Sequence, residues 1–391
     1  MFSSLMETRP FRRAAVTAVA AALLTGTSTP APAAEPDRPV LRAAMQQMVD
    51  AGLTGVQMRV HDRHGDWAGS AGASRLGGSA KPAVDERFRI GSTTKTFTAT
   101  VVLQLAASRR IALDAPAAGY LPRLGLDRRI TVRMLLQHTS GLVNFTGDAY
   151  ADGVTVSGIP WSGKRWVDNR FHTYRPADLV HFASSRPLKF APGTDWSYSN
   201  TNYVVLRLLI EKVTGHSYAY EIRQRILRPL KLRHTVVPGT SPEVPGPHAH
   251  SYYRYQDAGR WRTVDVTRQN PSWISSAGEM ISTTADLRTF FAALLGGKLV
   301  PAPLLHEMQK PHATIDPTMS YGLGLQMQRL PCGVTVLFHD GDVQGAGTLM
   351  YSTPDGKTTM EAAVNYVDGV DAPLGVYRQQ MHKLVDAVFC S

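Results

Sequence analysis

Three short segments of the chain contain residue types that together can carry out nucleophilic catalysis. The first is Ser92-Thr93-Thr94-Lys95, at the start of a run with apolar residues at helical spacing. Positions i and i+3 share a face of a helix, so the Ser92 hydroxyl and the Lys95 ammonium are expected to meet. The helix N-terminus also points N–H groups at the atom that Ser92 attacks, which helps to form an oxyanion hole. Ser92 needs such help because a protonated hydroxyl is a poor nucleophile.

The other two segments supply further proton-transfer and substrate-binding groups. Tyr198-Ser199-Asn200 follows a Pro-Gly turn, and His339-Asp340-Gly341 ends a strand-like run. A tyrosine beside a lysine ammonium is expected to ionise well below its usual pKa of about 10 and to act as a general base. Gly341 would allow a substrate to lie close to the backbone.

Each segment also has a structural explanation when it is taken alone. Ser92 can be a helix cap with a solvated Lys95, Tyr198 a core residue, and His339 a strand histidine. About one Ser-x-x-Lys motif is expected by chance in a chain of this length. Together, in the order helix start, loop and strand end, the segments indicate a serine hydrolase that works through an acyl-enzyme, with Ser92 as nucleophile and Lys95 and Tyr198 as proton carriers.

The elements that must position these residues follow from hydrophobic periodicity. Helices are expected over 40–51, 92–108, 132–138, 176–184, 202–214, 284–295 and 375–389, and strands over 55–60, 67–71, 334–338, 347–352 and 360–366. Strands therefore lie near both ends, which predicts an α/β (α+β) fold: an antiparallel sheet formed from both chain ends and flanked by helices, with an inserted, mostly helical subdomain. The α/β part would comprise about 40–111 and 271–391, and the helical part about 112–270. The polar stretch 147–169 is expected to be a long loop that borders the site.

The first 33 residues have the order of a secretory signal peptide. Arg9, Arg12 and Arg13 precede an apolar run over 14–24, and small residues follow at 31–34. The run is shorter than the roughly 20 residues that span a bilayer, and no later stretch resembles a membrane anchor. We therefore expect a secreted, soluble protein of residues 34–391, exported by the general or the twin-arginine route.

Cysteine content and net charge agree with an exported protein. An even pair, Cys332 and Cys390, is expected to form a disulfide in an oxidising compartment, two buried thiols being the alternative. The formal net charge is +11; removing residues 1–33, with three arginines and one glutamate, leaves +9. A basic surface of this charge could bind an anionic cell envelope, or it could be a soluble surface that binds no partner. Nucleic acid is not expected, because the basic residues are dispersed.

The combined motifs resemble the penicillin-recognising serine hydrolases, in the class C β-lactamase-like group, especially the secreted D-alanyl-D-alanine carboxypeptidases of actinomycete type. The resemblance covers nearly all of the chain after the leader. The stretches that carry it are FRIGSTTKTFTATVVLQL, ITVRMLLQHTSGL, WSYSNTNYVV, EKVTGHSY, SSAGEMISTTADLRTFF, YGLGLQ and the final Phe389-Cys390. This similarity implies a β-lactamase/transpeptidase-like fold that needs no metal or organic cofactor.

The resemblance also implies a role for each matching position. Ser92 would be acylated, and Lys95 and Tyr198 would move protons in acylation and deacylation. Asn200 would bind the substrate amide, and the backbone N–H groups of Ser92 and Asp342 would bind the oxyanion. His339 would support the Tyr198 proton path, and Trp273 would form an aromatic wall of the site. Cys332 and Cys390 would form the family's disulfide.

The chain departs from the family at the carboxylate-binding positions. The carboxypeptidases typically carry His-Thr-Gly-Thr with an arginine on the preceding strand, whereas this chain has His339-Asp340-Gly341-Asp342 and Gln326. Two ionised aspartates repel a substrate carboxylate and attract an ammonium. An Arg or Lys from elsewhere, paired with these acids, would restore carboxylate binding.

The predicted function is therefore a secreted serine hydrolase acting on D-amino-acid-containing peptides, D-alanyl-D-alanine carboxypeptidase-like. The alternatives are a D-stereospecific amidase, aminopeptidase or esterase, a non-catalytic penicillin-binding sensor, and a cell-wall binding protein with a decayed site. The expected substrate is a small peptide or one like a peptidoglycan stem, with β-lactams as inhibitors. The protein is expected to be a monomer.

Overall fold

The computed structural model describes residues 38–369 and 374–390. The predicted signal peptide lies outside the described residues. In the described part no helix is both long enough and apolar enough to cross a membrane.

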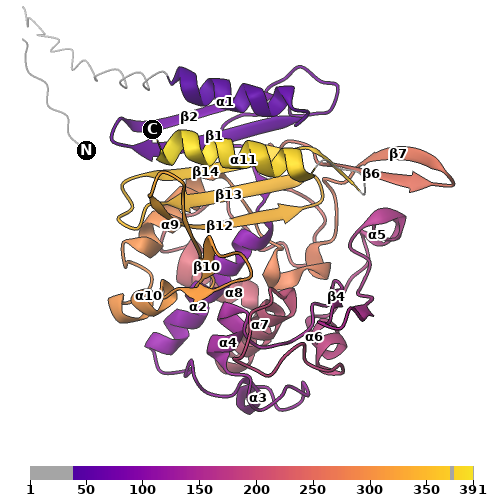
Figure 1. Ribbon diagram of the computed structural model, residues 1–391, viewed down its shortest axis with the longest axis vertical. Coiled ribbons are helices and arrows are strands. Elements are labelled where there is room, and N and C mark those ends of the chain that lie inside the picture. The colour runs from indigo at the N-terminus through magenta and orange to yellow at the C-terminus, as the bar shows by residue number, and fades with distance from the viewer. Residues whose placement is uncertain (1–37, 370–373, 391) are drawn as a thin grey trace, which may run out of the picture. The chain divides into compact units, whose positions relative to one another are not determined.

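The main element is an antiparallel sheet that joins the two ends of the chain, as the sequence predicted (Figure 1). The strand order is β2-β1-β14-β13-β12-β11-β10-β9. The N-terminal hairpin of β1 and β2 pairs through β1 with β14, in the register Arg59 opposite Glu361. The strands are β1 (Gly55–Asp62), β2 (Gly65–Gly72), β9 (His312–Ala313), β10 (Met319–Tyr321), β11 (Gln326–Arg329), β12 (Thr335–Val343), β13 (Ala346–Ser352) and β14 (Thr359–Asn365).

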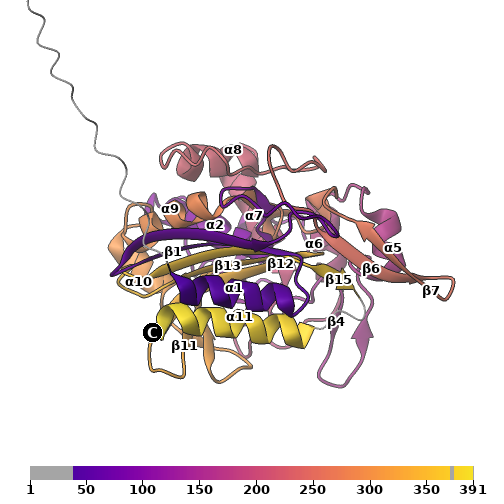
Figure 2. The ribbon, with the colours of Figure 1, turned by 90° about the horizontal axis from the view of Figure 1, so that it is seen from above.

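Helices cover both faces of this sheet (Figure 2). On one face lie α1 (Pro39–Asp50) and α11 (Leu374–Phe389), which pack against each other. Alternate residues of β1, such as Val56, Met58 and Val60, are buried in the core beneath these two helices. This alternation is the period-2 pattern of a strand with one apolar face. On the other face lie α2 (Thr94–Ala107) and α9 (Thr284–Leu295).

The middle of the chain is built mainly from helices around the core of α2 and α7. It contains α3 (Ala117–Tyr120), α4 (Val132–Gln137), α5 (Gly163–Asn169), α6 (Pro176–Ser184), α7 (Asn200–Thr214), α8 (Tyr218–Ile222) and the π-helical turn η2 (Arg223–Leu227). Two short elements precede this middle part: the strand β3 (Phe88–Arg89) and the 3₁₀ turn η1 (Gly91–Thr93). Four follow it: the 3₁₀ turns η3 (Pro271–Trp273) and η4 (Ser275–Ala277), the strand β8 (Ile281–Ser282) and the helix α10 (Ala302–Met308).

Two local expectations differ from the structure. The stretch 147–169 is not a continuous loop, because it contains the small hairpin β4 (Asp148–Ala149) and β5 (Thr155–Val156) and the helix α5. The hairpin β6 (Tyr252–Asp257) and β7 (Arg260–Asp265) was not predicted at all. Its first strand pairs in parallel with β15 (Val367–Gly369). Most of β7 is exposed, so the strand has no buried face to produce an apolar alternation.

The predicted disulfide between Cys332 and Cys390 is present, with the two Cα atoms 5.8 Å apart. It ties the end of α11 to the turn between β11 and β12. Closing a loop of 58 residues stabilises a chain by about 4 kcal/mol in the chain-entropy description. The bond thus fixes the C-terminus to the strand that leads into the predicted site.

Candidate active site

Ser92 lies in η1, directly before α2, where strand β12 crosses close to it. A Cβ atom on Gly341 would lie 2.0 Å from the Ile90 carbonyl oxygen and 2.9 Å from the Ser92 nitrogen. A Cβ atom on Gly91, which has a φ of +48°, would lie 2.5 Å from the Asp342 nitrogen. Only glycines allow this approach. The result is that the backbone of Ser92 and that of Asp342 lie side by side, as the predicted oxyanion hole requires.

The Lys95 ammonium is fully buried and has a complete set of acceptors. Its Nζ atom donates to Ser92 Oγ at 3.0 Å, to Asn200 Oδ1 at 2.8 Å and to the Ala277 carbonyl oxygen at 2.8 Å. These bonds use all three ammonium protons. The same nitrogen lies 4.7 Å from the centre of the Tyr198 ring. The predicted meeting of Ser92, Lys95, Tyr198 and Asn200 is thus present in the structure.

The pKa values of this group differ from the expectation. Burial lowers the pKa of Lys95 well below its usual value, and the charge of Asp340 opposes that effect. Burial raises the pKa of Tyr198 well above 10, although its hydrogen bond with Ser92 acts in the other direction. Part of the Tyr198 side chain is accessible to solvent, but the surrounding protein removes most of its hydration. The prediction of a readily ionised tyrosine is therefore wrong, because desolvation outweighs the hydrogen bond with Ser92 and the charge of Asp340 raises the pKa further.

A buried histidine that the sequence reasoning missed holds the Tyr198 segment. His138 follows α4 in the left-handed conformation, with a φ of 66°. Its Nδ1 atom accepts hydrogen bonds from the Ser199 backbone N–H at 3.3 Å and from Asn202 Nδ2 at 3.0 Å. The centres of the His138 and Tyr198 rings are 4.3 Å apart. Burial lowers the pKa of His138 well below its usual value, so the ring is neutral. The signal for this residue was the family-like stretch ITVRMLLQHTSGL.

His339 does not contact Tyr198 directly. Its Nδ1–H group donates to the Asp340 carbonyl oxygen at 2.7 Å, and its Nε2 atom accepts from the Tyr321 hydroxyl at 3.0 Å. Burial lowers the pKa of His339 to about 4, which keeps the ring neutral at pH 7. The ring of Tyr321 lies 6.4 Å from that of Tyr198. Any support that His339 gives to the Tyr198 proton path must pass through Tyr321, which the sequence reasoning did not single out.

A second group of residues, which the sequence did not predict, holds the Ala277 carbonyl group that accepts a hydrogen bond from Lys95. Arg207 on α7 donates to Ser275 Oγ at 3.0 Å and to Glu279 Oε1 at 3.1 Å. Ser275 has a positive φ of 50°, an unusual conformation for a residue with a side chain. Together these bonds hold η4, and with it the carbonyl group of Ala277, against Lys95.

The acidic residues of β12 lie at the end of the strand that is not covered by β11. The β11–β12 pairing ends at Phe338, so the segment 339–343 has no neighbour from β11. Asp340 is exposed and accepts a hydrogen bond from Gln326 Nε2 at 2.8 Å. Asp342 accepts one from the Tyr366 hydroxyl at 2.5 Å.

These carboxylates have no cationic partner among the described residues that lies within ion-pair distance. The Asp342 carboxyl is accessible to solvent, but desolvation by the surrounding protein raises its pKa to about 7. Asp368 and Asp340 add to this shift, whereas the Tyr366 hydrogen bond and the charge of Arg378, which forms no ion pair with Asp342, oppose it. Asp368 on β15 has a pKa raised by burial to about 6. The paired Arg or Lys that would restore carboxylate binding is therefore not found in the described part of the chain.

Trp273 does not form an open wall. It is only 6% exposed, and its indole N–H donates to Gln269 Oε1 at 3.1 Å. Little of its surface is available to a substrate, although η3 directly precedes the turn that holds Lys95.

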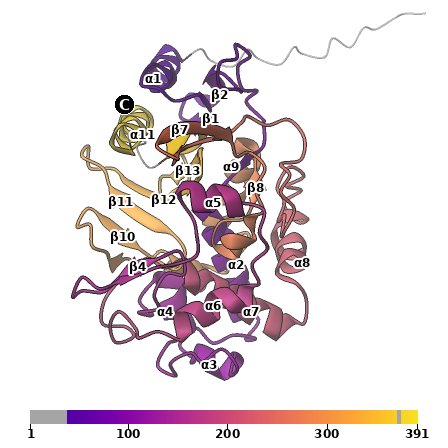
Figure 3. The same ribbon diagram turned by 90° about the vertical axis from the view of Figure 1, so that its right-hand side faces the viewer.

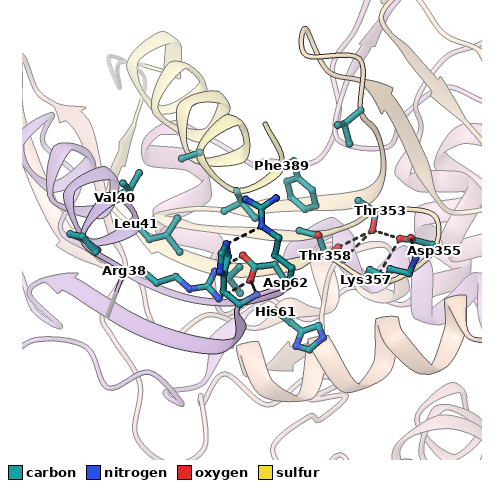
Figure 4. A pocket seen from close by; sticks show the side chains of 17 residues that line it. Arg38, Val40, Leu41, His61, Asp62, Thr353, Asp355, Lys357, Thr358 and Phe389 are labelled. Carbon is teal, nitrogen blue, oxygen red and sulfur yellow. Dashed lines mark hydrogen bonds and ion pairs between the residues drawn. The ribbon is translucent and has the colours of Figure 1, made fainter. Parts of the chain in front are cut away.

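A large cavity of about 870 Å³ lies elsewhere, between the start of α1, the β1–β2 turn and the end of α11 (Figure 4). It contains none of the predicted catalytic or substrate-binding residues. In this cavity Arg38 pairs with Asp62 and Lys357 with Asp355, whereas Arg63 donates to the His64 ring. Over the described residues, no cluster of His, Cys, Asp and Glu side chains is suited to a metal ion.

The fold and the arrangement of residues around Ser92 are of the penicillin-binding and β-lactamase type. The chain belongs to the Beta-lactamase family, whose profile matches residues 41–380. It is 26% identical over 307 residues to penicillin-binding protein 4* of Bacillus subtilis, covering 76% of this chain and 64% of that protein. It is 27% identical over 237 residues to the putative penicillin-binding protein PbpX of the same species, covering 61% and 52%. The chain thus spans only part of the length of these curated relatives.

Solved structures with the same fold cover more of the chain. A D-stereospecific amidohydrolase from Streptomyces sp. is 37% identical, with a TM-score of 0.79, over 91% of this chain and 99% of that one. A D-amino acid amidase from Ochrobactrum anthropi SV3 has a TM-score of 0.77 at 24% identity, over 89% and 98%. The second similarity concerns the fold alone.

Proposed function

We propose that this protein is a serine hydrolase that forms an acyl-enzyme at Ser92 and cleaves amides of D-amino acids or short D-peptides that carry a free ammonium group. The observation that carries the proposal is a combination of two features. Lys95 is hydrogen-bonded to Ser92, and the two carboxylates at the end of β12 have neutral hydrogen-bond donors but no ion-pair partner among the described residues. The similarity to a D-stereospecific amidohydrolase supports it.

The proposed chemistry begins with Lys95. Burial lowers the pKa of Lys95, so the ammonium loses a proton more readily than it would in water. The neutral amine can then accept the Ser92 proton as Oγ attacks the substrate carbonyl. The negative charge that develops on the carbonyl oxygen faces the backbone N–H groups of Ser92 and Asp342. Tyr198, which stays protonated, donates its hydroxyl proton to the leaving nitrogen and is reprotonated from Lys95. Water then attacks the ester by the reverse proton route.

Substrate selection in this proposal depends on charge. Asp340 and Asp342 stand where the similar carboxypeptidases bind a terminal carboxylate with threonines, and Gln326 replaces their arginine. Two carboxylates within a few ångströms of a substrate carboxylate repel it, and they attract an ammonium. The D-alanyl-D-alanine carboxypeptidase activity remains the second candidate, because the chain is similar to penicillin-binding proteins.

The test compares kcat/KM on two matched D-peptides. One ends in a free carboxylate and has a blocked amine; the other is amidated and has a free amine. We expect the amidated peptide to be preferred by roughly tenfold or more, since a hydrogen bond to a charged group contributes about 1.5–3 kcal/mol. A preference for the free carboxylate would instead establish the carboxypeptidase activity.

Both activities must disappear in Ser92→Ala and persist in Ser185→Ala, a control at the exposed end of α6. Activity that survives in Ser92→Ala would overturn the acyl-enzyme. A β-lactam should add its mass to the native protein and not to Ser92→Ala, as expected if such compounds acylate this serine.

We also propose that the protein is exported and that its mature form starts near Ala34. Mass spectrometry of the protein from a culture medium tests this directly. A chain that keeps residues 1–33 and stays within the cells would contradict it.

A further inference from the structure

A second cavity, of about 530 Å³, lies beside α8 and η2 and is lined by cations without acids. The charged residues of its lining are Arg223, Arg228, Lys231 and Arg233, and no Asp or Glu belongs to it. All four side chains are exposed. None of them forms an ion pair with a carboxylate of the described residues; Arg228 donates to the neutral amide of Gln224 at 3.0 Å.

Some other cations of the chain, in contrast, do have acidic partners. Arg225, on the same turn, is neutralised by Glu221 at 2.5 Å. In the larger cavity of Figure 4, Arg38 and Lys357 both have carboxylate partners. Four cations that surround one hollow repel each other, and a bound anion relieves that repulsion.

The backbone beneath the cations has two unusual conformations. Residues Arg223–Leu227 form a π-helical turn, a feature that is frequent at functional sites. Lys231 has a positive φ of 57°, and the Leu232 N–H donates to the Leu227 carbonyl oxygen at 2.8 Å. Leu227 and Leu232 are buried and form an apolar floor. Arg223 therefore belongs to the π-helical turn, and Arg228, Lys231 and Arg233 lie in the hydrogen-bonded turns that follow it.

This cavity is separate from the catalytic residues. α8 packs against α2 and α7 on the side away from β12 (Figures 2 and 3). Changes at its rim should therefore leave the chemistry at Ser92 intact.

We propose that the α8–η2 cavity binds successive phosphate groups of a linear phosphate polymer. Three of its four cations are arginines, whose planar guanidinium groups match phosphate oxygens in pairs. The hollow is much larger than one phosphate group, and four charges match several phosphates of one chain. The net charge of +9 that remains after removal of residues 1–33 favours the approach of such a polymer over long distances.

Cations near the end of a helix also stabilise the helix dipole, which provides a purely structural explanation. That explanation predicts a lower unfolding temperature for variants without these cations and no phosphate-dependent binding. The experiment must therefore measure both binding and stability.

The test uses the full mature chain and inorganic polyphosphate of defined length, titrated by fluorescence anisotropy at several salt concentrations. Arg223→Ala/Arg228→Ala is compared with Arg260→Ala/Arg262→Ala, which removes the same charge from exposed positions of β7. We expect the cavity variant to bind at least tenfold more weakly at low salt, and the slope of log K against log salt to fall by about one to two. The β7 variant should bind within about twofold of the native protein.

Two further ligands identify the source of the phosphate. Orthophosphate at the same phosphate concentration should not compete, since one group cannot engage four cations. Vesicles of phosphatidylglycerol should bind no more tightly than polyphosphate. Equal losses in both double variants would show attraction by net charge alone and would overturn the proposal. Binding to vesicles without binding to polyphosphate would overturn it in favour of a membrane surface. The unfolding temperature of each variant is measured in parallel, and an unchanged value verifies that the variant is folded. A lower unfolding temperature of the cavity variant with unchanged binding of polyphosphate would support the structural explanation and overturn the proposal.

Discussion

The two halves of the candidate site differ in how their polar groups are satisfied. In the half that contains the nucleophile, Lys95 is buried and each of its protons has an acceptor. In the half at the end of β12, Asp340 and Asp342 are accessible and are bonded to the neutral Gln326 and Tyr366. A buried polar group tolerates few changes, because an unmatched partner costs about 1–3 kcal/mol. Accessible charges can change more freely, so the first half fixes the chemistry and the second selects the substrate.

The largest effect is expected from a change in the buried half. Lys95→Ala removes the base for Ser92 and leaves Asn200 Oδ1 and the Ala277 carbonyl without their donor. We expect kcat to fall by roughly 10³-fold or more, since removing a proton-transfer group typically costs 10²–10⁴-fold. Lys212→Ala, an exposed lysine on α7, is the matched control. Comparable losses in both variants would mean that Lys95 acts through stability alone.

An intermediate effect is expected from exchanging the charges of the accessible half. Asp340→Thr/Asp342→Thr/Gln326→Arg replaces two acids and an amide by two hydroxyls and a cation. The ratio of kcat/KM for a free-carboxylate D-peptide over its amidated, amine-bearing counterpart should rise about 100-fold, from the sum of attraction gained and repulsion lost. Steady-state kinetics with both peptides measures it. No gain on the carboxylate peptide in a folded triple variant would contradict the electrostatic account.

The same division separates what could be predicted from the sequence. The Ser92–Lys95 contact is local, so helix geometry is enough to predict it. The sheet formed from both chain ends follows from alternating strands, and the Cys332–Cys390 bond from an even pair of cysteines in a chain that is expected to be exported. The direction of the Tyr198 pKa shift could not be predicted, because burial by distant residues decides it.

Other features depend on contacts that no sequence pattern encodes. His339 bonds to Tyr321 across the sheet and not to Tyr198. Tyr366 directly follows β14, and its hydroxyl donates a hydrogen bond to Asp342. In the proposed function the charge of this carboxyl has the largest effect on substrate selection. The β6–β7 hairpin lacks an apolar face over most of β7, so its periodicity was invisible.

A smaller effect concerns pH. With its pKa raised to about 7, Asp342 is neutral below that pH and anionic above it. The kcat/KM for a D-amino acid amide with a free amine should therefore rise as pH increases through about 7, and fall again as the substrate amine, of pKa about 8, loses its proton. The N-acetylated amide, which has no ammonium, is the control for the Lys95 titration that both substrates share.

The ratio of kcat/KM for these two amides isolates the carboxyl. We expect it to rise up to about tenfold between pH 5.5 and 7.5 in the native protein, consistent with one charge interaction of about 1.4 kcal/mol. In Asp342→Asn the ratio should be flat over this range. A rise of the same size in Asp342→Asn would assign the titration to another group, such as Asp368, whose pKa is raised to about 6.

The smallest effect tests whether the neutral partner of Asp342 tunes its charge. The Tyr366 hydroxyl donates to Asp342 Oδ1 and lowers the pKa of the carboxyl against the effect of burial. A hydrogen bond to the charged form favours that form, so Tyr366→Phe should raise the pKa of Asp342. The midpoint pH at which the kcat/KM ratio rises should therefore increase by about half to one unit. The plateau value above the limb should change little, because the ionised carboxylate still meets the ammonium. A mere loss of packing would lower kcat at every pH and leave the midpoint in place; Tyr351→Phe, a buried tyrosine on the neighbouring strand β13, supplies that comparison. If the midpoint stays at its native pH in Tyr366→Phe, the phenol does not set the charge of Asp342, and the accessible half selects its substrate through the carboxylates alone.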